Sequence, residues 1–238
     1  MRSFWSDPFL WIHLSGVATV PIFLGLCLLG LAVGSPMLPV WLEVFLVAVA
    51  GIAPVLWMQW FRPFYIFSIL VVAVKPQNLT NAQQQILTRF KTELNQALAI
   101  FVAVLLGVIL WQLYRLAPLA ATVAPFPPSW RWAGLLLAVA GFLASNLFLQ
   151  VSASVMAVLL TPESEFAATK PYVLEKIRHD FTIAPWQVDR LLPTFAGETT
   201  ATAAVPVESM GPASGSLVNL KPADTNLPTS LPEQSLEK

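Results

Sequence analysis

The sequence predicts an all-α polytopic membrane protein with four transmembrane helices, one short interfacial helix and a disordered C-terminal tail. Its 238 residues are 56% hydrophobic and only 11% charged, whereas a soluble domain is about 25% charged. Four apolar stretches reach the ~20 helical residues that cross a bilayer. The tryptophans are the third observation, because tryptophan forms belts at both membrane surfaces. Eight of the nine stand at the ends of apolar runs, namely Trp5, Trp11, Trp41, Trp57, Trp60, Trp111, Trp130 and Trp132.

The first two predicted spans cover about residues 11–33 and 39–60. Each contains a proline, Pro21 in the first and Pro54 in the second. A proline inside a helix removes one backbone hydrogen bond and bends the axis. Neighbouring groups in a membrane protein can satisfy the freed carbonyl, so we expect both segments to cross the bilayer as bent helices.

A shorter apolar run extends from Phe64 to Val74, and Pro63 and Pro76 bracket it. It is too short to cross the hydrocarbon core as a helix. We expect an interfacial helix here. A shallow re-entrant helix and a bent continuation of the second span remain as alternatives.

Residues 80–94 predict a polar, amphipathic helix outside the bilayer. Thr80 and Gln83 have the spacing of a capping box, and one helical face then carries Ile86, Leu87, Phe90 and Leu94. We expect this helix to continue without a break into the third span, at about residues 95–114.

The fourth predicted span covers about residues 131–160 and carries two distinct faces. Small residues lie within about 60° of one another on a helical wheel, and such a seam lets another helix backbone approach closely. They are Gly134, Ala138, Gly141, Ser145 and Ser152. A polar stripe of Asn146, Gln150 and Ser154 lies nearly opposite. The favoured interpretation of the stripe is interhelical hydrogen bonding, and the alternative is a polar path or ligand contact. Either way, we expect the helix to pack on two flanks.

Residues 161–195 predict a small helical region on the cytoplasmic side, and residues 1–160 form the transmembrane part. Pro171 suits the first position of one helix, and Pro185 that of a second, with Trp186 as a packing anchor. From residue 196 to residue 238 there is no aromatic side chain. Such a segment cannot bury enough surface to offset its ordering entropy, so we expect it to be disordered.

The distribution of lysine and arginine near the span ends predicts the orientation. One side of the membrane would hold Arg2, Arg62, Lys75, Arg89, Lys91, Lys170, Lys176 and Arg178. The other side would hold only Arg115 and Arg131. Because basic residues concentrate on the cytoplasmic side, both termini are expected there.

Few residues are candidates for chemistry. Glu43 is the one acidic residue inside a predicted span, and intramembrane carboxylates are functional candidates by default. It lies close to a helix start that favours negative charge, so an electrostatic or capping role is preferred over a proton relay or ion site. His13, at the entrance to the first span, is a weak candidate ligand for the metal of a chlorophyll or a haem.

Composition and motifs exclude several classes of function. A formal net charge of zero provides no basic field for nucleic acid, and the single Cys27 excludes an intrachain disulfide framework. The sequence has no P-loop, no dinucleotide-binding glycine pattern, no Gly-x-Ser-x-Gly motif and no zinc-ligand spacing. We therefore predict no catalytic site, no metal site and no cofactor, while bound pigment is left open.

Three segments carry a resemblance to a known family. They are MRSFWSDPFLWIHLSG at 1–16, LPVWLE at 38–43 and WMQWFRPFY at 57–65. They resemble the low-complexity tail membrane proteins of cyanobacteria, and the likeness extends to about Phe195. The resemblance implies a host with internal photosynthetic membranes, so a thylakoid location stands beside the plasma membrane. It implies no activity and no binding residue.

For function, the leading hypothesis is a non-enzymatic accessory or assembly factor that packs against other membrane proteins. Membrane lipids are further expected partners, and the chain could also form a homo-oligomer. The alternative is a small transporter or channel component that uses Glu43 with Asn146 and Gln150.

Overall fold

The structure, a computed structural model, describes residues 3–69 and 71–192. These residues are mostly helical. Four helical segments among them are long and apolar enough to cross a membrane, at Pro8–Leu31, Val40–Phe61, Glu93–Val123 and Pro128–Leu159. The predicted fold class is therefore confirmed. The predicted disordered tail, residues 196–238, lies outside the described residues.

The first span consists of α1 (Pro8–Ser15), a 3-10 turn (Gly16–Thr19) and α2 (Val20–Leu31). Asp7 caps α1, because its side chain accepts a hydrogen bond from the Phe9 amide at 2.9 Å. The 3-10 turn lies directly before Pro21, where the sequence predicts a bend. Pro21 has no amide to offer Val17, and the Val20 amide bonds the Val17 carbonyl instead, which tightens the turn.

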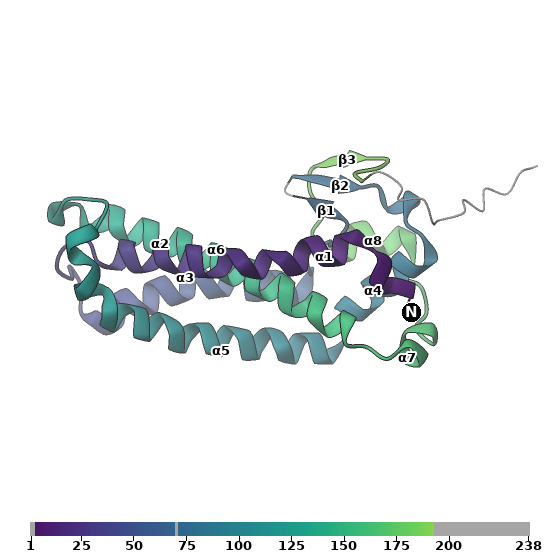
Figure 1. Cartoon of the computed structure of the whole chain (residues 1–238), viewed down its shortest axis with the longest axis horizontal. Coiled ribbons are helices and arrows are strands. Elements are labelled where there is room, and N and C mark those ends of the chain that lie inside the picture. The colour runs from purple at the N-terminus through teal and green to yellow at the C-terminus, as the bar shows by residue number, and fades with distance from the viewer. Residues whose placement is uncertain (1–2, 70, 193–238) are drawn as a thin grey trace, which may run out of the picture. The chain divides into compact units, whose positions relative to one another are not determined.

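The other spans are α3 (Val40–Phe61), α5 (Glu93–Leu116) and α6 (Arg131–Leu159). A 3-10 segment at Ala117–Val123 and a turn at Pro128–Trp130 connect α5 to α6. Figure 1 shows the four spans side by side, with the start of α1 and the end of α6 at the same end of the bundle. We call this the N-terminal end and the opposite one the far end.

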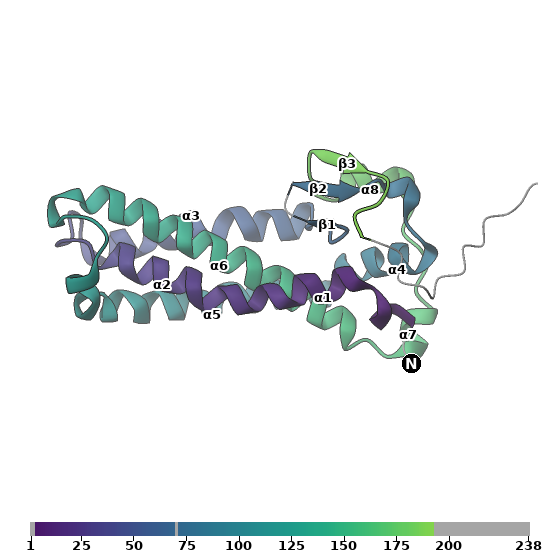
Figure 2. The same ribbon diagram turned by 45° about the horizontal axis from the view of Figure 1, so that its top comes forward.

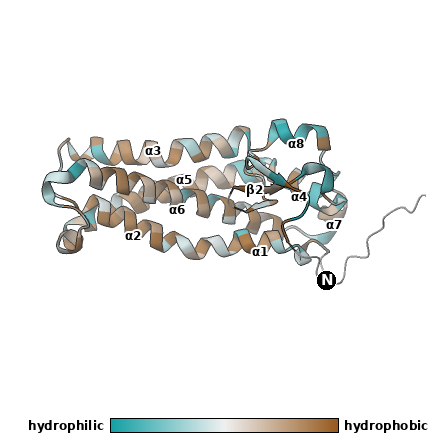
Figure 3. Ribbon diagram, turned by 90° about the horizontal axis from the view of Figure 1, so that it is seen from above, coloured by the Kyte–Doolittle hydropathy of each residue, from teal (hydrophilic) through white to brown (hydrophobic). Residues whose placement is uncertain are grey.

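Helix α6 is the central element of the bundle, since it contacts α1, α2, α3 and α5. Figure 2 shows it between the neighbouring spans. The outward faces of the spans stay apolar, with Trp57 68% exposed and Phe101 64% exposed. Figure 3 shows the same division, with hydrophobic residues along the spans and hydrophilic ones around α4, α7 and α8. The exposed apolar faces are what a bilayer would cover.

The run from Phe64 to Val74 is not the expected interfacial helix. It contains strand β1 (Ser68–Ile69), which pairs antiparallel with β2 (Val72–Val74). A third strand, β3 (Trp186–Val188), pairs parallel with β2. β-Branched and aromatic residues favour strands once a partner is present. The partner here comes from far along the chain, which local patterning does not reveal.

The same strand corrects a second expectation, because Pro185 precedes β3 and does not open a helix. Pro171 does not open one either, since α8 begins three residues later and covers Leu174–Asp180. The short α7 covers Glu163–Ala167. Trp186 is exposed and is therefore not the packing anchor that its sequence position suggested.

The predicted polar helix forms, but it does not run into the third span. It is α4 (Asn81–Phe90), and Thr80 and Gln83 make the capping box in both directions. The helix ends because side chains donate hydrogen bonds to its last backbone carbonyls. Thr92 donates to the Arg89 carbonyl at 3.0 Å, and Asn95 donates to the Phe90 carbonyl at 2.9 Å. These local bonds compete with helix continuation, and α5 starts afresh at Glu93.

Residues 62–69, 71–91 and 161–192 form what we call the flanking unit, at the N-terminal end of the spans. Its aromatic core is continuous with side chains of α1 and α6, including Phe9, Leu10 and Val155. The aromatic members from the flanking unit are Tyr65, Phe67, Phe90, Phe166 and Phe181, and Phe4 from the N-terminal segment joins them. The flanking unit and the spans therefore share one hydrophobic core.

Candidate functional site

The far end of the bundle contains a buried ion pair. Glu43, in the first turn of α3, has no exposed surface, and its carboxylate bonds the guanidinium of Arg131 at the start of α6. The other carboxylate oxygen accepts the Met37 amide at 2.8 Å and the Leu38 amide at 3.4 Å. Both oxygens of Glu43 are therefore engaged with the protein.

Arg131 connects this pair to α2. Its Nη1 donates to the Leu31 carbonyl at 2.7 Å and to the Val33 carbonyl at 2.8 Å. These are end-of-helix carbonyls, where positive charge is favourable. The loop beyond them depends on Gly34, which has a φ of +62° and leaves no room for a Cβ against the Pro128 carbonyl. The ion pair thus clamps α2, α3 and α6 together, an electrostatic role of the kind preferred for Glu43.

The small-residue seam of α6 faces α1 and α2. A Cβ placed on Gly134 would lie 2.6 Å from the Gly30 carbonyl oxygen, and one on Gly141 would lie 2.7 Å from the Phe23 carbonyl oxygen. Ala138 is fully buried in the same contact. The absence of side chains at the two glycines lets the α2 and α6 backbones touch.

The two serines of the seam have separate partners. Ser145 donates to the Phe142 carbonyl of its own helix at 2.8 Å. Ser152 donates to the His13 carbonyl in α1 at 2.9 Å. Only Ser152 therefore adds an interhelical bond to this seam.

The polar stripe of α6 lies on its other flank and joins two further helices. The Asn146 amide donates to the Gly51 carbonyl of α3 at 2.9 Å. The Gln150 amide donates to the Ala99 carbonyl of α5 at 3.0 Å. Both side chains are buried, so the stripe makes interhelical hydrogen bonds.

His13 bonds the backbone of its own helix. Its Nδ1 donates to the Phe9 carbonyl at 2.9 Å. The Phe64 ring packs against the imidazole, with centroids 5.6 Å apart. An Nδ1 bond to a backbone carbonyl is also the usual second contact of a ligating histidine, so the ligand role of His13 stays a prediction.

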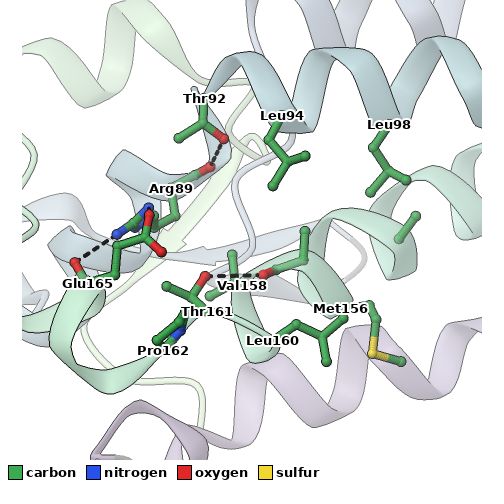
Figure 4. Close-up of a pocket in the computed structure, with 12 residues that line it drawn as sticks. Arg89, Thr92, Leu94, Leu98, Met156, Val158, Leu160, Thr161, Pro162 and Glu165 are labelled. Carbon is green, nitrogen blue, oxygen red and sulfur yellow. Dashed lines mark hydrogen bonds and ion pairs between the residues drawn. The ribbon is translucent and has the colours of Figure 1, made fainter.

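A cavity of about 450 Å³ lies between the start of α5 and the end of α6 (Figure 4). This volume falls within the range of small-molecule pockets, about 300–1,000 Å³. Its walls are apolar and include Leu94, Leu98, Ala153, Met156, Ala157 and Leu160. Sequence reasoning missed the cavity because its two walls come from distant segments. The unusual exposure of Leu94 and Leu160, each 69%, marks the site in the structure.

The rim of this cavity is polar, and its polar side chains bond one another. Arg89 donates to the Glu165 carboxylate at 2.6 Å, to the Glu165 carbonyl at 2.7 Å and to the Thr169 hydroxyl at 2.9 Å. Figure 4 shows this pair at the edge of the apolar walls. The arrangement suits an amphipathic chain or the side chains of a neighbouring helix. Within the described segments, no three His, Cys, Asp or Glu side chains gather to hold a metal ion.

A second hollow of about 460 Å³ lies on the other side of α5, against α3. It is lined by Ala53, Leu56, Trp57, Trp60, Phe61 and Ile100. Helix α5 is therefore flanked by an apolar depression on each side.

The flanking unit holds one strongly perturbed acid, Asp180 in α8. The Tyr172 hydroxyl donates to its carboxylate, the His179 ring bonds it at 2.8 Å, and Lys91 lies 3.5 Å away. The hydrogen bonds from Tyr172 and His179, with the nearby Lys91 charge, lower the pKa of Asp180 to about 2. Burial and the Asp180 carboxylate raise the pKa of Tyr172. This cluster fastens α8 to the segment before it.

Comparison with known proteins gives one match. Residues 6–193 match the model of the low-complexity tail membrane protein-like family. No curated protein and no solved structure matches the chain. The matched segment contains nearly all of the described residues, including the four candidate spans and the flanking unit. The chain therefore belongs to the low-complexity tail membrane protein-like family and is an integral, multi-pass membrane protein.

Proposed function

We propose that this chain is a non-enzymatic accessory or assembly factor that packs against other membrane proteins. The observation that carries this proposal is that polar side chains within the spans bond other parts of the same bundle. Glu43 is held by Arg131, while Asn146 and Gln150 bond the backbones of α3 and α5. Groups held in this way stabilise one helix arrangement, and both carboxylate oxygens of Glu43 are occupied by partners inside the bundle.

The outer surface of α5 supports the second half of the proposal. Apolar depressions of about 450 and 460 Å³ flank the helix. A Cβ placed on Gly107 of α5 would meet nothing within 4 Å among the described residues, so none of their contacts requires this glycine. A neighbouring transmembrane helix could approach closely at such a position and fill the depression beside Ile100, which lies two turns away on the same face of α5.

The orientation and location belong to the same proposal. We place both termini in the cytoplasm, because the N-terminal end carries most of the lysine and arginine. Arg131 at the far end is buried in the ion pair, which leaves Arg115 as the exposed cation there among the described residues. A reporter fused after Ala196 should then be cytoplasmic, and one placed between Pro118 and Pro128 should not. The thylakoid or plasma membrane of a cyanobacterial host remains the proposed location.

The decisive experiment is affinity isolation of the tagged full chain from native membranes in mild detergent, followed by mass spectrometry. A specific membrane-protein partner should co-purify. Gly107→Leu should weaken its recovery, because leucine fills the open position on α5. Gly25→Leu is the matched control, since a Cβ on Gly25 of α2 also meets nothing within 4 Å.

The alternative outcomes are distinct. A wild-type chain that purifies alone, as one copy, would contradict the proposal. A self-associated chain would make the partner a second copy. A flux in proteoliposomes that Glu43→Gln or Asn146→Leu abolishes would instead support a transporter.

A further inference from the structure

Two residues with exposed apolar side chains are backbone neighbours at one end of the three-stranded sheet. Trp186 is 67% exposed and Val71 is 51% exposed. The Trp186 amide donates to the Val71 carbonyl at 3.2 Å, so the two residues are direct neighbours. We call them the sheet-end patch. The side chain of Trp186 is large enough to bury 150–250 Å², yet the flanking unit leaves it mostly uncovered.

The patch lies at the end of the sheet that faces the spans. Strands β2 and β3 run parallel, and both begin at this end, where Val72 pairs with Trp186. In Figures 1 and 2 this end of the sheet lies at about the level of the end of α3 along the long axis of the bundle, and the strands run from there away from the spans. The last turns of α3 carry Trp57 and Trp60, which are exposed belt residues.

A contact with the first span also places the start of the sheet at the depth of the belt tryptophans. Phe64, four residues before β1, packs its ring on the His13 imidazole of the first span, with the ring centroids 5.6 Å apart. His13 follows the exposed Trp11 by two residues. The sheet therefore starts at the level where the belt tryptophans mark the membrane surface.

Two exposed arginines lie close to this end of β3. Arg178 donates to the side chain of Gln187, the residue after Trp186, at 3.2 Å. Arg62 donates to the Arg178 carbonyl at 3.1 Å, and both arginines are exposed. An exposed tryptophan and exposed arginines at the same end of a strand match the headgroup layer, where aromatic rings rest and where phosphates attract basic side chains.

We infer that Val71 and Trp186 lie in the lipid headgroup layer of the membrane that the chain spans, and that they dock the sheet on the bilayer surface. Trp186 then completes the belt at the N-terminal end. The flanking unit is then attached at two points, through the hydrophobic core that it shares with α1 and α6 and through the lipid contact of Val71 and Trp186. Two attachment points fix its orientation relative to the membrane. The inference depends on the four spans and not on the proposed accessory function.

Site-directed spin labelling of the full chain tests this inference. Nitroxide labels are placed at Trp186→Cys or Val71→Cys in a Cys27→Ala background, reconstituted in phosphatidylcholine–phosphatidylglycerol vesicles. Both labels should collide more with oxygen and several-fold less with a water-soluble nickel chelate than a control label at Val173→Cys. Val173 is 53% exposed on the flanking unit, before α8.

Equal nickel accessibility at positions 186 and 173 would overturn the inference. So would protection of position 186 in native membranes but not in the lipid vesicles, because a protein partner would then cover the patch. Two label sites are used so that one perturbed variant does not decide the result, and unchanged chromatographic behaviour confirms that each variant is folded.

Discussion

The carboxylate of Glu43 and the guanidinium of Arg131 form a buried ion pair that joins the starts of α3 and α6. Arg131 also bonds carbonyls at the end of α2. The pair is therefore a three-helix clamp at the far end of the bundle, in a region that otherwise consists of apolar spans and short connections.

Glu43→Gln should destabilise the protein by about 3–5 kcal/mol, because it leaves the Arg131 charge buried without its partner. Denaturant titration of the detergent-solubilised chain measures this loss. Glu93→Gln is the matched control, since Glu93 also lies in the first turn of a span but is exposed. Similar stabilities for the two variants would show that the clamp contributes little.

Gly134→Ala should lower stability by about 1–3 kcal/mol, the usual cost of overpacking. The new methyl group would press on the Gly30 carbonyl and on the Val33 side chain, each 2.6 Å away. Gly25→Ala introduces the same group on an open helix face and should be neutral or slightly stabilising. Thermal unfolding in detergent compares the two, and a stable Gly134→Ala would refute close contact between α2 and α6.

Asn146→Leu should cost less than about 2 kcal/mol, because interhelical hydrogen bonds in membranes contribute ~0.6 kcal/mol on average. The Asn146 side-chain oxygen finds no hydrogen-bond partner among the described residues, so its removal offsets part of the lost bond to Gly51. Asn146→Asp should be much more damaging, since it places a charge in the bundle. Denaturant titration of both variants tests the role of the stripe, and an equal loss of stability would contradict it.

The attachment of α8 should weaken in strong acid. The folded pKa of Asp180 is about 2, below the ~3.9 of an unfolded aspartate. Its contribution is therefore complete above about pH 4 and is lost as the pH falls toward 2. Hydrogen exchange of the α8 amides measures the change, and Asp180→Asn should remove this pH dependence.

Asp189 provides the control for that experiment. Its pKa is also lowered, by hydrogen bonds from Lys75 and Asn78, but the pair with Lys75 is largely exposed. Exposed pairs contribute little to stability, so Asp189→Asn should leave the acid transition of α8 in place. If the acid transition disappeared in Asp189→Asn, the transition would report Asp189 and not Asp180, and the prediction would be wrong.

Local patterns predicted those features whose cause is local. The capping box at Thr80 forms as its spacing indicates, because both partners lie within one helical turn. The small residues of α6 do meet another backbone, since glycine at membrane depth permits close approach. The helix break before Glu93 was missed, because the competing bonds from Thr92 and Asn95 outweigh a continuous apolar face.

The sequence by itself determined the four crossings, because twenty apolar residues in lipid have to satisfy their own backbone as a helix. Only the tertiary structure decided which groups those helices bring together. Glu43 meets Arg131, and the segment after α3 becomes two strands because β3 arrives from beyond α8. Ion pairs and strand pairs join residues distant in sequence, and their formation depends on packing that no local pattern records.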